Sequence, residues 1–216
     1  MKKFASFFAV FLFITLFAVA SEAGDRNIPV EVAQLTDSLK KQFAPDRRVA
    51  LLDVDYSFSD KNVMLRGVTT SAEAKNALLK ELARKGYAVM DCLELLPDVK
   101  GLEGKTCGII NVSVANMRVA PDFSSEMMTQ SLMGMPVRVL QRDGWVRIQT
   151  PDNYIAWVHR VGVHPVTEEE MAAWNKAEKI VVTAHYGFVY SEPNQTSQTV
   201  SDVVAGNRLK WEGSKG

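Results

Sequence analysis

The sequence has no excess of charge of either sign, because its 25 lysines and arginines are balanced by 25 aspartates and glutamates. Proteins that bind nucleic acid need a basic surface to neutralise phosphates, and no basic stripe along this chain makes up for the missing excess. The composition therefore argues against a nucleic-acid partner. With 47% hydrophobic and 23% charged residues, the 216-residue chain suits one large globular domain or two to three small ones.

The chain also lacks the residue patterns that most often carry catalysis or hold a cofactor. It has no glycine-rich phosphate loop and no serine–histidine–aspartate arrangement. His159 and His164 are five positions apart, whereas two metal ligands on one helix face are three or four apart. The third histidine, His185, lies in a predicted strand. We therefore expect no metal ion and no cofactor.

Cysteine is scarce, and the two cysteines allow two interpretations. Cys92 lies in a predicted strand and Cys107 in a predicted linker, 15 positions further on. In an oxidising compartment they could form a disulfide, or they could be free thiols that behave as small apolar residues. A catalytic cysteine needs a lowered pKa, usually from a helix N-terminus and a nearby histidine. Cys92 has neither in the sequence around it, so we predict no catalytic residue.

Long apolar runs are absent except at the N-terminus, where "FASFFAVFLFITLFAVA" follows two lysines. A basic start, an apolar run and a small-residue cleavage site predict a signal peptide over residues 1–20, with Ala23 as a second cleavage position. No cysteine stands at the cleavage point, so a lipoprotein anchor is not expected. The alternative is an uncleaved membrane anchor, because about 17 residues is the lower limit for a spanning helix.

Residues 28–97 predict a small α+β domain with the element order α-β-β-α-β. An amphipathic helix ends at Pro45, "VALLDVDYSF" alternates as a strand, and "VMLRGV" forms the next strand after a turn. We expect a second helix to begin with a capping box at Thr70 and Glu73 and to end at Gly86. The strand "YAVMDCLELL" follows. The buried faces should hold Val32, Leu35, Leu39 and Phe43; Ala50, Leu52, Val54, Tyr56 and Phe58; and Ala74, Leu78 and Leu82.

This element order, together with "NVMLRGVTTSAEAKNALLKELARKGYAVMDCLELL", resembles the BON domain, a small envelope-associated module. The matching features are the strand that ends in Gly67, the helix rich in small residues, and Gly86 before the last strand. The resemblance implies binding to membranes or envelope partners. Because the segment has no basic face for anionic lipid, we expect membrane contact only through the signal peptide or weakly through this module.

A linker rich in glycine and lysine, residues 98–108, precedes a series of short strands over residues 109–165. Within that series, "GWVRIQTPDNYIAWV" predicts a β-hairpin, because two alternating strands flank Pro-Asp-Asn. The series suggests a small barrel and resembles a bacterial SH3-like domain. The family pattern is matched by Asn116-x-Arg118, Pro121, Gly134 before "PVRVL", Gly144-Trp145, and Ala156-Trp157-Val158, where alanine replaces the usual glycine.

The end of the chain repeats this pattern. A connecting helix is predicted over residues 166–179, with a capping box at Thr167 and Glu170. Residues 180–216 then align with the SH3-like segment at an offset of 72, which places Pro193 on Pro121 and Gly206 on Gly134. The offset places the last residue on Gly144, so we expect an incomplete second barrel and a chain that is the front part of a longer protein.

The predicted fold class is therefore α+β followed by all-β: an αββαβ BON-like module, a small SH3-like β-barrel, a short helix and an incomplete second SH3-like barrel. This arrangement resembles the N-terminal part of NlpC-type cell-wall cysteine endopeptidases of the Bacteroidetes kind. In that family a C-terminal papain-like domain cleaves peptidoglycan stem peptides, and the SH3-like domains shape the substrate site or hold the wall. The family's nucleophile lies in Asp-Cys-Ser-Gly, whereas Cys92 is followed by Leu93.

The resemblance implies an exported protein of the periplasm or cell envelope that binds peptidoglycan stem peptide or another envelope component. The chain itself is expected to show no hydrolase activity. The alternative is a stand-alone, non-enzymatic envelope adaptor that binds peptidoglycan, lipid or a protein partner.

The candidate ligand-binding residues are Asn116, Arg118, Tyr154 and Trp157. Tyr154 lies at the turn of the predicted hairpin, and the SH3-like pattern places Asn116 and Arg118 near it. Aromatic faces and an arginine suit a peptide that carries carboxylates. Trp157 has an alternative role in the structure of the barrel itself.

Overall fold

The computed structural model describes residues 29–213, so the predicted signal peptide lies outside the described residues. The described chain forms two compact units. The first comprises residues 29–45 and Leu52–Glu94, and the second comprises Asp46–Leu51 and residues 95–213. Across these residues, the helices are all too short or too polar to cross a membrane.

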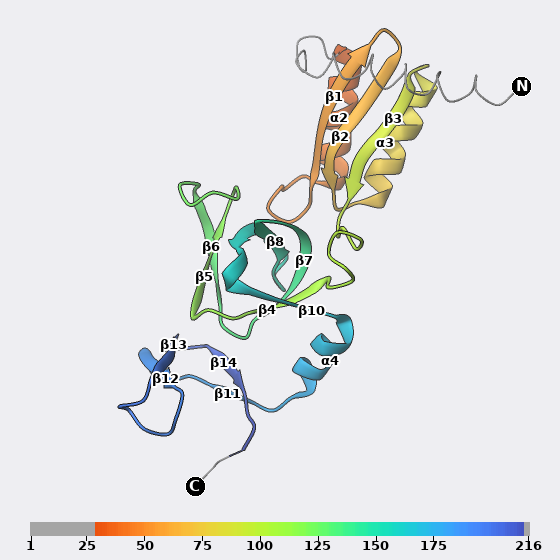
Figure 1. Cartoon of the computed structure of the whole chain (residues 1–216). Coiled ribbons are helices and arrows are strands. Elements are labelled where there is room, and N and C mark those ends of the chain that lie inside the picture. The colour runs from red at the N-terminus through yellow and green to blue at the C-terminus, as the bar shows by residue number, and fades with distance from the viewer. Residues whose placement is uncertain (1–28, 214–216) are drawn as a thin grey trace, which may run out of the picture. The chain divides into compact units, whose positions relative to one another are not determined.

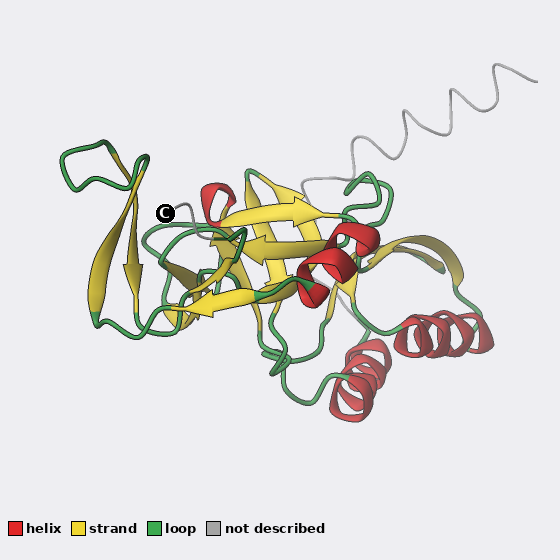
Figure 2. Ribbon diagram, turned by 90° about the horizontal axis from the view of Figure 1, so that it is seen from below, coloured by secondary structure: helices red, strands yellow, loops and turns green. Residues whose placement is uncertain are grey.

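The first unit is a three-stranded sheet, in which β1 and β2 are antiparallel, with two helices on one face (Figures 1 and 2). Its elements are α2 (Val30–Phe43), β1 (Leu52–Ser59), β2 (Asn62–Thr69), α3 (Ala72–Arg84) and β3 (Ala88–Leu95). The strands lie in the order β1-β2-β3. The predicted turn joins β1 to β2, and the register runs from Leu52 opposite Thr69 to Ser59 opposite Asn62.

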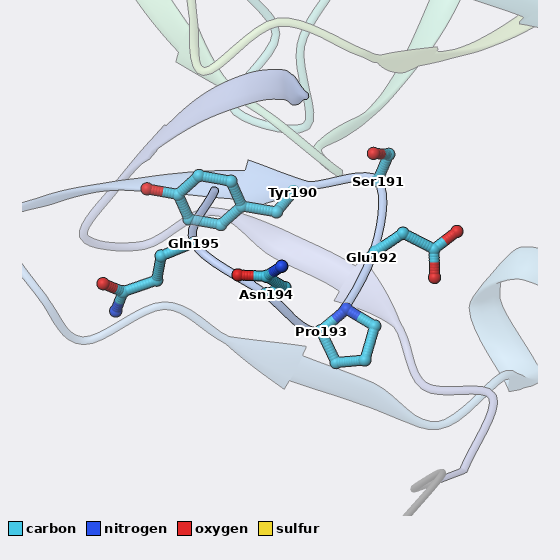
Figure 3. Close-up of a pocket in the computed structure, with 6 residues that line it drawn as sticks. All are labelled: Tyr190, Ser191, Glu192, Pro193, Asn194 and Gln195. Carbon is cyan, nitrogen blue, oxygen red and sulfur yellow. The ribbon is translucent and has the colours of Figure 1, made fainter. Parts of the chain in front are cut away.

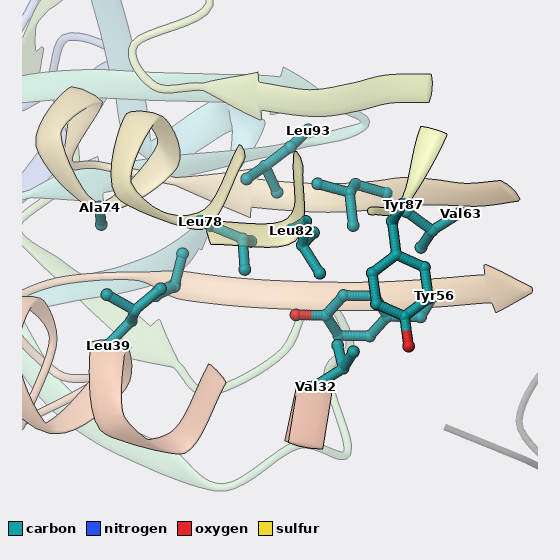
Figure 4. Packing of buried hydrophobic residues seen from close by; sticks show 11 residues of the cluster. Val32, Leu39, Tyr56, Val63, Ala74, Leu78, Leu82, Tyr87 and Leu93 are labelled. Carbon is teal, nitrogen blue, oxygen red and sulfur yellow. The ribbon is translucent and has the colours of Figure 1, made fainter. Parts of the chain in front are cut away.

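The core of the first unit lies between the helices and the sheet (Figure 4). The predicted helix faces and the alternating face of β1 supply most of it. One buried polar residue was not foreseen: Thr36 of α2 is 5% exposed. Its hydroxyl donates to the Val32 carbonyl at 2.9 Å and shares a hydrogen bond with the Tyr56 hydroxyl, so the polar group is satisfied inside the core.

The start of α3 differs from the prediction by one residue. Ser71, not Thr70, is the N-cap, and its hydroxyl accepts a hydrogen bond from the Ala74 amide at 3.0 Å. The side chain of Thr69 in turn accepts from the Ser71 amide at 3.1 Å. Because Thr69 is buried at the end of β2, the chain stays extended for one residue longer than the predicted capping box requires.

The second unit contains a seven-stranded antiparallel sheet that curls around its own core (Figure 1). The strands are β4 (Cys107–Ile110), β5 (Val114–Arg118), β6 (Met127–Leu132), β7 (Pro136–Asp143), β8 (Trp145–Gln149), β9 (Ile155–His159) and β10 (Val163–Val166), with the short helix η2 (Arg160–Gly162) before β10. Their order in the sheet is β10-β4-β7-β8-β9-β5-β6. The predicted hairpin is β8 and β9, in which Trp145 lies opposite His159.

Two segments outside the predicted SH3-like boundaries belong to this unit. The predicted linker 98–108 carries Leu102, which is 3% exposed in the barrel core, and its end forms the start of β4 at Cys107. The segment Asp46–Leu51 follows α2 in sequence, yet the Arg48 carbonyl accepts a hydrogen bond from the Ile155 amide at 2.6 Å. Glycine and lysine composition suggested a linker at residues 98–108, and alternation suggested that residues 49–51 begin the first strand with Ala50 on its buried face. The strand instead begins at Leu52, Ala50 is half-buried, and apolar residues and backbone pairing join both segments to the second unit.

The helix α4 (Glu168–Lys176) follows the barrel and begins with the predicted capping box at Thr167 and Glu170. Met171 on its inner face is 8% exposed. The ammonium group of Lys179 donates to the Ala177 carbonyl at 2.9 Å and lies 5.1 Å from the centre of the Trp174 ring. A cation beside the last carbonyls stabilises the C-terminus of this helix.

The remaining strands repeat the first four strands of the barrel. They are β11 (Lys179–Val181), β12 (Tyr186–Tyr190), β13 (Thr199–Val204) and β14 (Arg208–Lys210). Both strand registers recur at the offset of 72. Cys107 opposite Arg138 becomes Lys179 opposite Lys210, and Val114 opposite Leu132 becomes Tyr186 opposite Val204. The irregularity near the end of β5 also recurs in β12. The internal repeat is therefore a repeat of backbone structure.

The second repeat buries little of its own surface. Among residues 179–213 only Val203 and Asn207 are buried. Hydrogen bonds join it to the first repeat: the Asn207 amide donates to the Ser113 carbonyl at 2.8 Å, the Ser113 hydroxyl donates to the Asp202 carboxylate at 2.6 Å, and the Arg208 amide donates to the Met133 carbonyl at 2.9 Å. The ordered structure of the second repeat thus depends on its attachment to the first.

Candidate functional site

The first SH3-like repeat carries a groove of about 200 Å³ beside β5, β8 and β9. Strand alternation determines which β5 side chains reach it. Ala115 and Met117 point into the core, at 3% and 0% exposure, so Asn116 and Arg118 lie on the outer face and line the groove. Both residues were predicted as ligand contacts from the sequence.

Three rings form one wall of this groove. Phe123 comes from the turn after β5, and its ring centre lies 4.8 Å from Trp145 and 5.1 Å from His159. The Trp145 and His159 rings are 5.3 Å apart, edge to face, because the two residues are cross-strand partners in the β8–β9 hairpin. Phe123 is 66% exposed, so much of its surface is accessible to a ligand.

Sequence patterns did not single out Phe123 or His159 for this site. Phe123 lies in a turn where no periodicity applies, and its partners are distant in sequence. The register of the predicted hairpin places His159 opposite Trp145, so His159 was identifiable from the sequence.

The polar part of the groove is held by hydrogen bonds. Arg118 donates from Nη1 to the Ser125 carbonyl at 2.5 Å, which leaves its other N–H groups for a ligand. The Asn116 side-chain oxygen accepts from Gln130 at 2.9 Å. Hydrogen bonds from Ser124 lower the pKa of Asp122 in the same turn, and the charge of Arg118 lowers it further. The groove therefore combines one guanidinium with an aromatic wall, which suits a small ligand that carries a carboxylate.

The other two predicted contacts do not line the groove. Trp157 is the cross-strand partner of Arg118, but its ring lies 5.1 Å from the Arg147 guanidinium. Tyr154 precedes β9 at the end opposite His159, and its ring lies 5.9 Å from the guanidinium of Arg48. The SH3-like pattern places all four residues in one domain, but the length of β9 separates Tyr154 from the groove.

Both cysteines are free thiols in the structure. Cys92 lies exposed in β3, and Cys107 lies half-buried in β4, each in a different sheet. Burial raises the pKa of the Cys107 thiol, and the negative charge of Glu168 raises it further. A raised pKa disfavours the thiolate, so Cys107 has a poor environment for a nucleophile.

One protein family matches part of the chain. Residues 117–161 match the bacterial dipeptidyl-peptidase SH3 domain, a match that includes most of the groove. This match fits a region associated with cell-wall peptidases. It does not extend to residues 28–97, so it does not test their resemblance to the BON domain. No curated protein matches the chain.

Solved structures with some similarity include two proteins of the NlpC/P60 group. An NlpC/P60 family protein from Bacillus cereus is 19% identical, with a TM-score of 0.41 and coverage of 50% of this chain and 48% of that one. An NlpC/P60 endopeptidase from Photobacterium damselae subsp. piscicida is 15% identical, with a TM-score of 0.42 and coverage of 54% and 29%. This chain thus spans about half or less of the length of each.

Proposed function

We propose that this chain is an exported cell-envelope protein whose first SH3-like repeat binds the stem peptide of peptidoglycan, as the non-catalytic part of an NlpC-type murein endopeptidase. The observation that carries the proposal is the groove that joins Arg118 to the Phe123, Trp145 and His159 rings. The family match to a dipeptidyl-peptidase SH3 domain over the same residues supports it.

The chemistry of a stem peptide suits this groove. Stem peptides are short and carry several carboxylates, and they present small aliphatic side chains between them. A guanidinium offers paired N–H donors to a carboxylate, and the ring wall offers an apolar surface to the backbone and methyl groups. Because the groove is open and about 200 Å³ in volume, it holds one or two residues of such a peptide rather than all of it.

The test is a titration of the chain with a soluble stem peptide that contains the D-glutamate and diamino-acid residues. Replacing Arg118→Gln removes a charge-assisted contact worth about 1.5 kcal/mol and should weaken binding roughly tenfold. Arg118 also stabilises the turn, because it donates a hydrogen bond to the Ser125 carbonyl. Phe123→Ala is therefore the second variant, since removing the Phe123 ring breaks no hydrogen bond to the backbone.

The matched control is Arg142→Gln, which removes an exposed arginine from β7 of the same barrel, outside the groove. It should bind the peptide like the wild type. Equal losses in Arg118→Gln and Arg142→Gln would show that only net charge matters, and the proposed peptide site would be wrong.

The same proposal gives the first unit the role of a BON-like module that binds an envelope partner. Its two helices cover one sheet face, and the other face carries Asp55, Arg66, Met90 and Glu94 as exposed residues. A face with no excess of basic residues favours a protein partner over an anionic membrane. Sedimentation with anionic vesicles tests this: the chain should stay in the supernatant, and co-sedimentation would favour the lipid-binding alternative.

A further inference from the structure

The second repeat carries a row of aromatic side chains where the first repeat carries its peptide groove. Tyr186, Phe188 and Tyr190 alternate along β12, so all three lie on one face of the strand. Ring centres are 5.1 Å apart between Tyr186 and Phe188 and 6.4 Å apart between Phe188 and Tyr190. Tyr186 is 58% exposed and Phe188 is 49% exposed.

The row is not the uncovered core of an incomplete barrel. At the offset of 72, the three aromatic residues correspond to Val114, Asn116 and Arg118, which face outward in the first repeat and line its groove. The core-facing positions of β5 correspond instead to Gly187 and Val189. The aromatic row therefore occupies groove positions of the repeat rather than core positions.

The turn beyond Tyr190 carries polar side chains, and in Figure 3 Gln195 extends to the same side as the Tyr190 ring whereas Glu192 points away from both. Tyr190 and residues 191–195 surround an open hollow of about 530 Å³, shown in Figure 3, which is within the size range of small-ligand sites. Asn194 holds the turn by accepting hydrogen bonds from Thr196. Within residues 29–213, the Gln195 amide and the Glu192 carboxylate make no hydrogen bond through their side chains, so both are available to a ligand.

The same backbone thus displays different chemistry in the two repeats. Tyr190 stands where the first repeat has Arg118, and Gln195 stands where it has Phe123. Residues 186–198 contain no lysine or arginine, so this surface does not suit a carboxylate or an anionic lipid. Ring faces combined with an amide group suit a neutral ligand that has apolar faces and hydroxyl or acetamido groups at its edges.

The geometry points to a saccharide site formed by Tyr186, Phe188, Tyr190 and Gln195 of the following turn. A pyranose ring presents C–H groups on its faces, and these meet the negative π-face of an aromatic ring favourably. The Gln195 amide then exchanges hydrogen bonds with hydroxyl and acetamido groups. The choice of an N-acetylhexosamine chain as the ligand rests on the proposed function at the cell wall, where the glycan strand accompanies the stem peptide.

The experiment titrates the full chain with tetra-N-acetylchitotetraose, followed by calorimetry and by saturation-transfer NMR. Replacing Phe188→Ala or Tyr190→Ala should weaken binding by about fivefold or more, since one ring contact is lost. Phe188→Tyr keeps the ring and should bind like the wild type. Val181→Ala, which trims an exposed apolar residue of β11 in the same repeat, is the control and should also bind like the wild type.

Two results would overturn the saccharide site: no binding of the tetrasaccharide to the wild type, or equal binding by the wild type and both alanine variants. Titration of the wild type with the stem peptide separates this inference from the proposed function. Peptide binding without tetrasaccharide binding leaves the peptide groove intact and rejects the saccharide site. Tetrasaccharide binding without peptide binding supports the saccharide site and rejects the peptide groove.

Discussion

The attachment of the second repeat to the first can be weakened by replacing one residue, Asn207→Ala. Asn207 is 0% exposed, and its amide joins the repeats by donating to the Ser113 carbonyl at 2.8 Å. Its side-chain oxygen accepts from the Val204 amide at 2.9 Å. Each partner left without a hydrogen bond costs about 1–3 kcal/mol when it is buried, so losing the two bonds should cost the second repeat roughly 2–6 kcal/mol of stability. The Asp202–Ser113 and Arg208–Met133 hydrogen bonds remain, but among residues 179–213 Val203 is the only buried apolar residue.

Hydrogen exchange by mass spectrometry measures this loss locally, which suits a chain of two units in which global unfolding need not be two-state. Peptides from residues 182–213 should exchange about thirtyfold faster or more in the variant, while peptides from residues 109–165 should be unchanged. Asn175→Ala, at an exposed position of α4, is the matched control and should exchange like the wild type. Unchanged protection of residues 182–213 in Asn207→Ala would refute the view that this amide holds the repeats together.

Three further predictions concern other parts of the structure. Gly134→Ala should also loosen the second repeat, because Gly134 has a φ of +81° and an added Cβ would lie 2.3 Å from a backbone carbonyl oxygen of that repeat; faster proteolysis there checks this. Hydrogen bonds from Arg48 lower the pKa of Asp46 to about 2, so Arg48→Ala should raise the NMR titration midpoint of Asp46 toward 3.8. The ion pair therefore favours the folded segment above pH 3.8, and this effect is lost as the pH falls through about 2. Cys92 should react with a thiol reagent faster than Cys107, because Cys92 is exposed whereas burial and Glu168 raise the pKa of Cys107; equal rates would contradict this.

Much of the fold could be predicted from local patterns. Alternation in β1 and the spacing of Val32 and Leu39 in α2 follow directly from side-chain geometry, so the buried faces of the first unit were identified correctly. The offset of 72 likewise predicted equivalent residues such as Val114 and Tyr186, because a repeat in sequence preserves strand register.

The features that were predicted wrongly depend on contacts between residues that are distant in the sequence. The Ser71 cap differs from the prediction because Thr69 is drawn into the core, which no local pattern reveals. Leu102 and Arg48 join the barrel through single contacts that composition cannot signal.

For the candidate site, the family pattern identified Asn116 and Arg118, which line the groove, but it grouped them with Tyr154. Phe123 completes the aromatic wall from a turn, where neither periodicity nor the quoted motif applies. The outer face of β5 was thus predictable, and the packing of the turn against the hairpin was not.

The most direct test of the peptide site is a chemical-shift map of the isotope-labelled chain during titration with the soluble stem peptide. We predict that the shifts concentrate on the groove, at Arg118, Phe123, Trp145 and His159, with little change at Tyr154. Shifts centred on Tyr154, or a spectrum that does not change at saturating peptide, would contradict the assignment of this groove to peptidoglycan stem peptide.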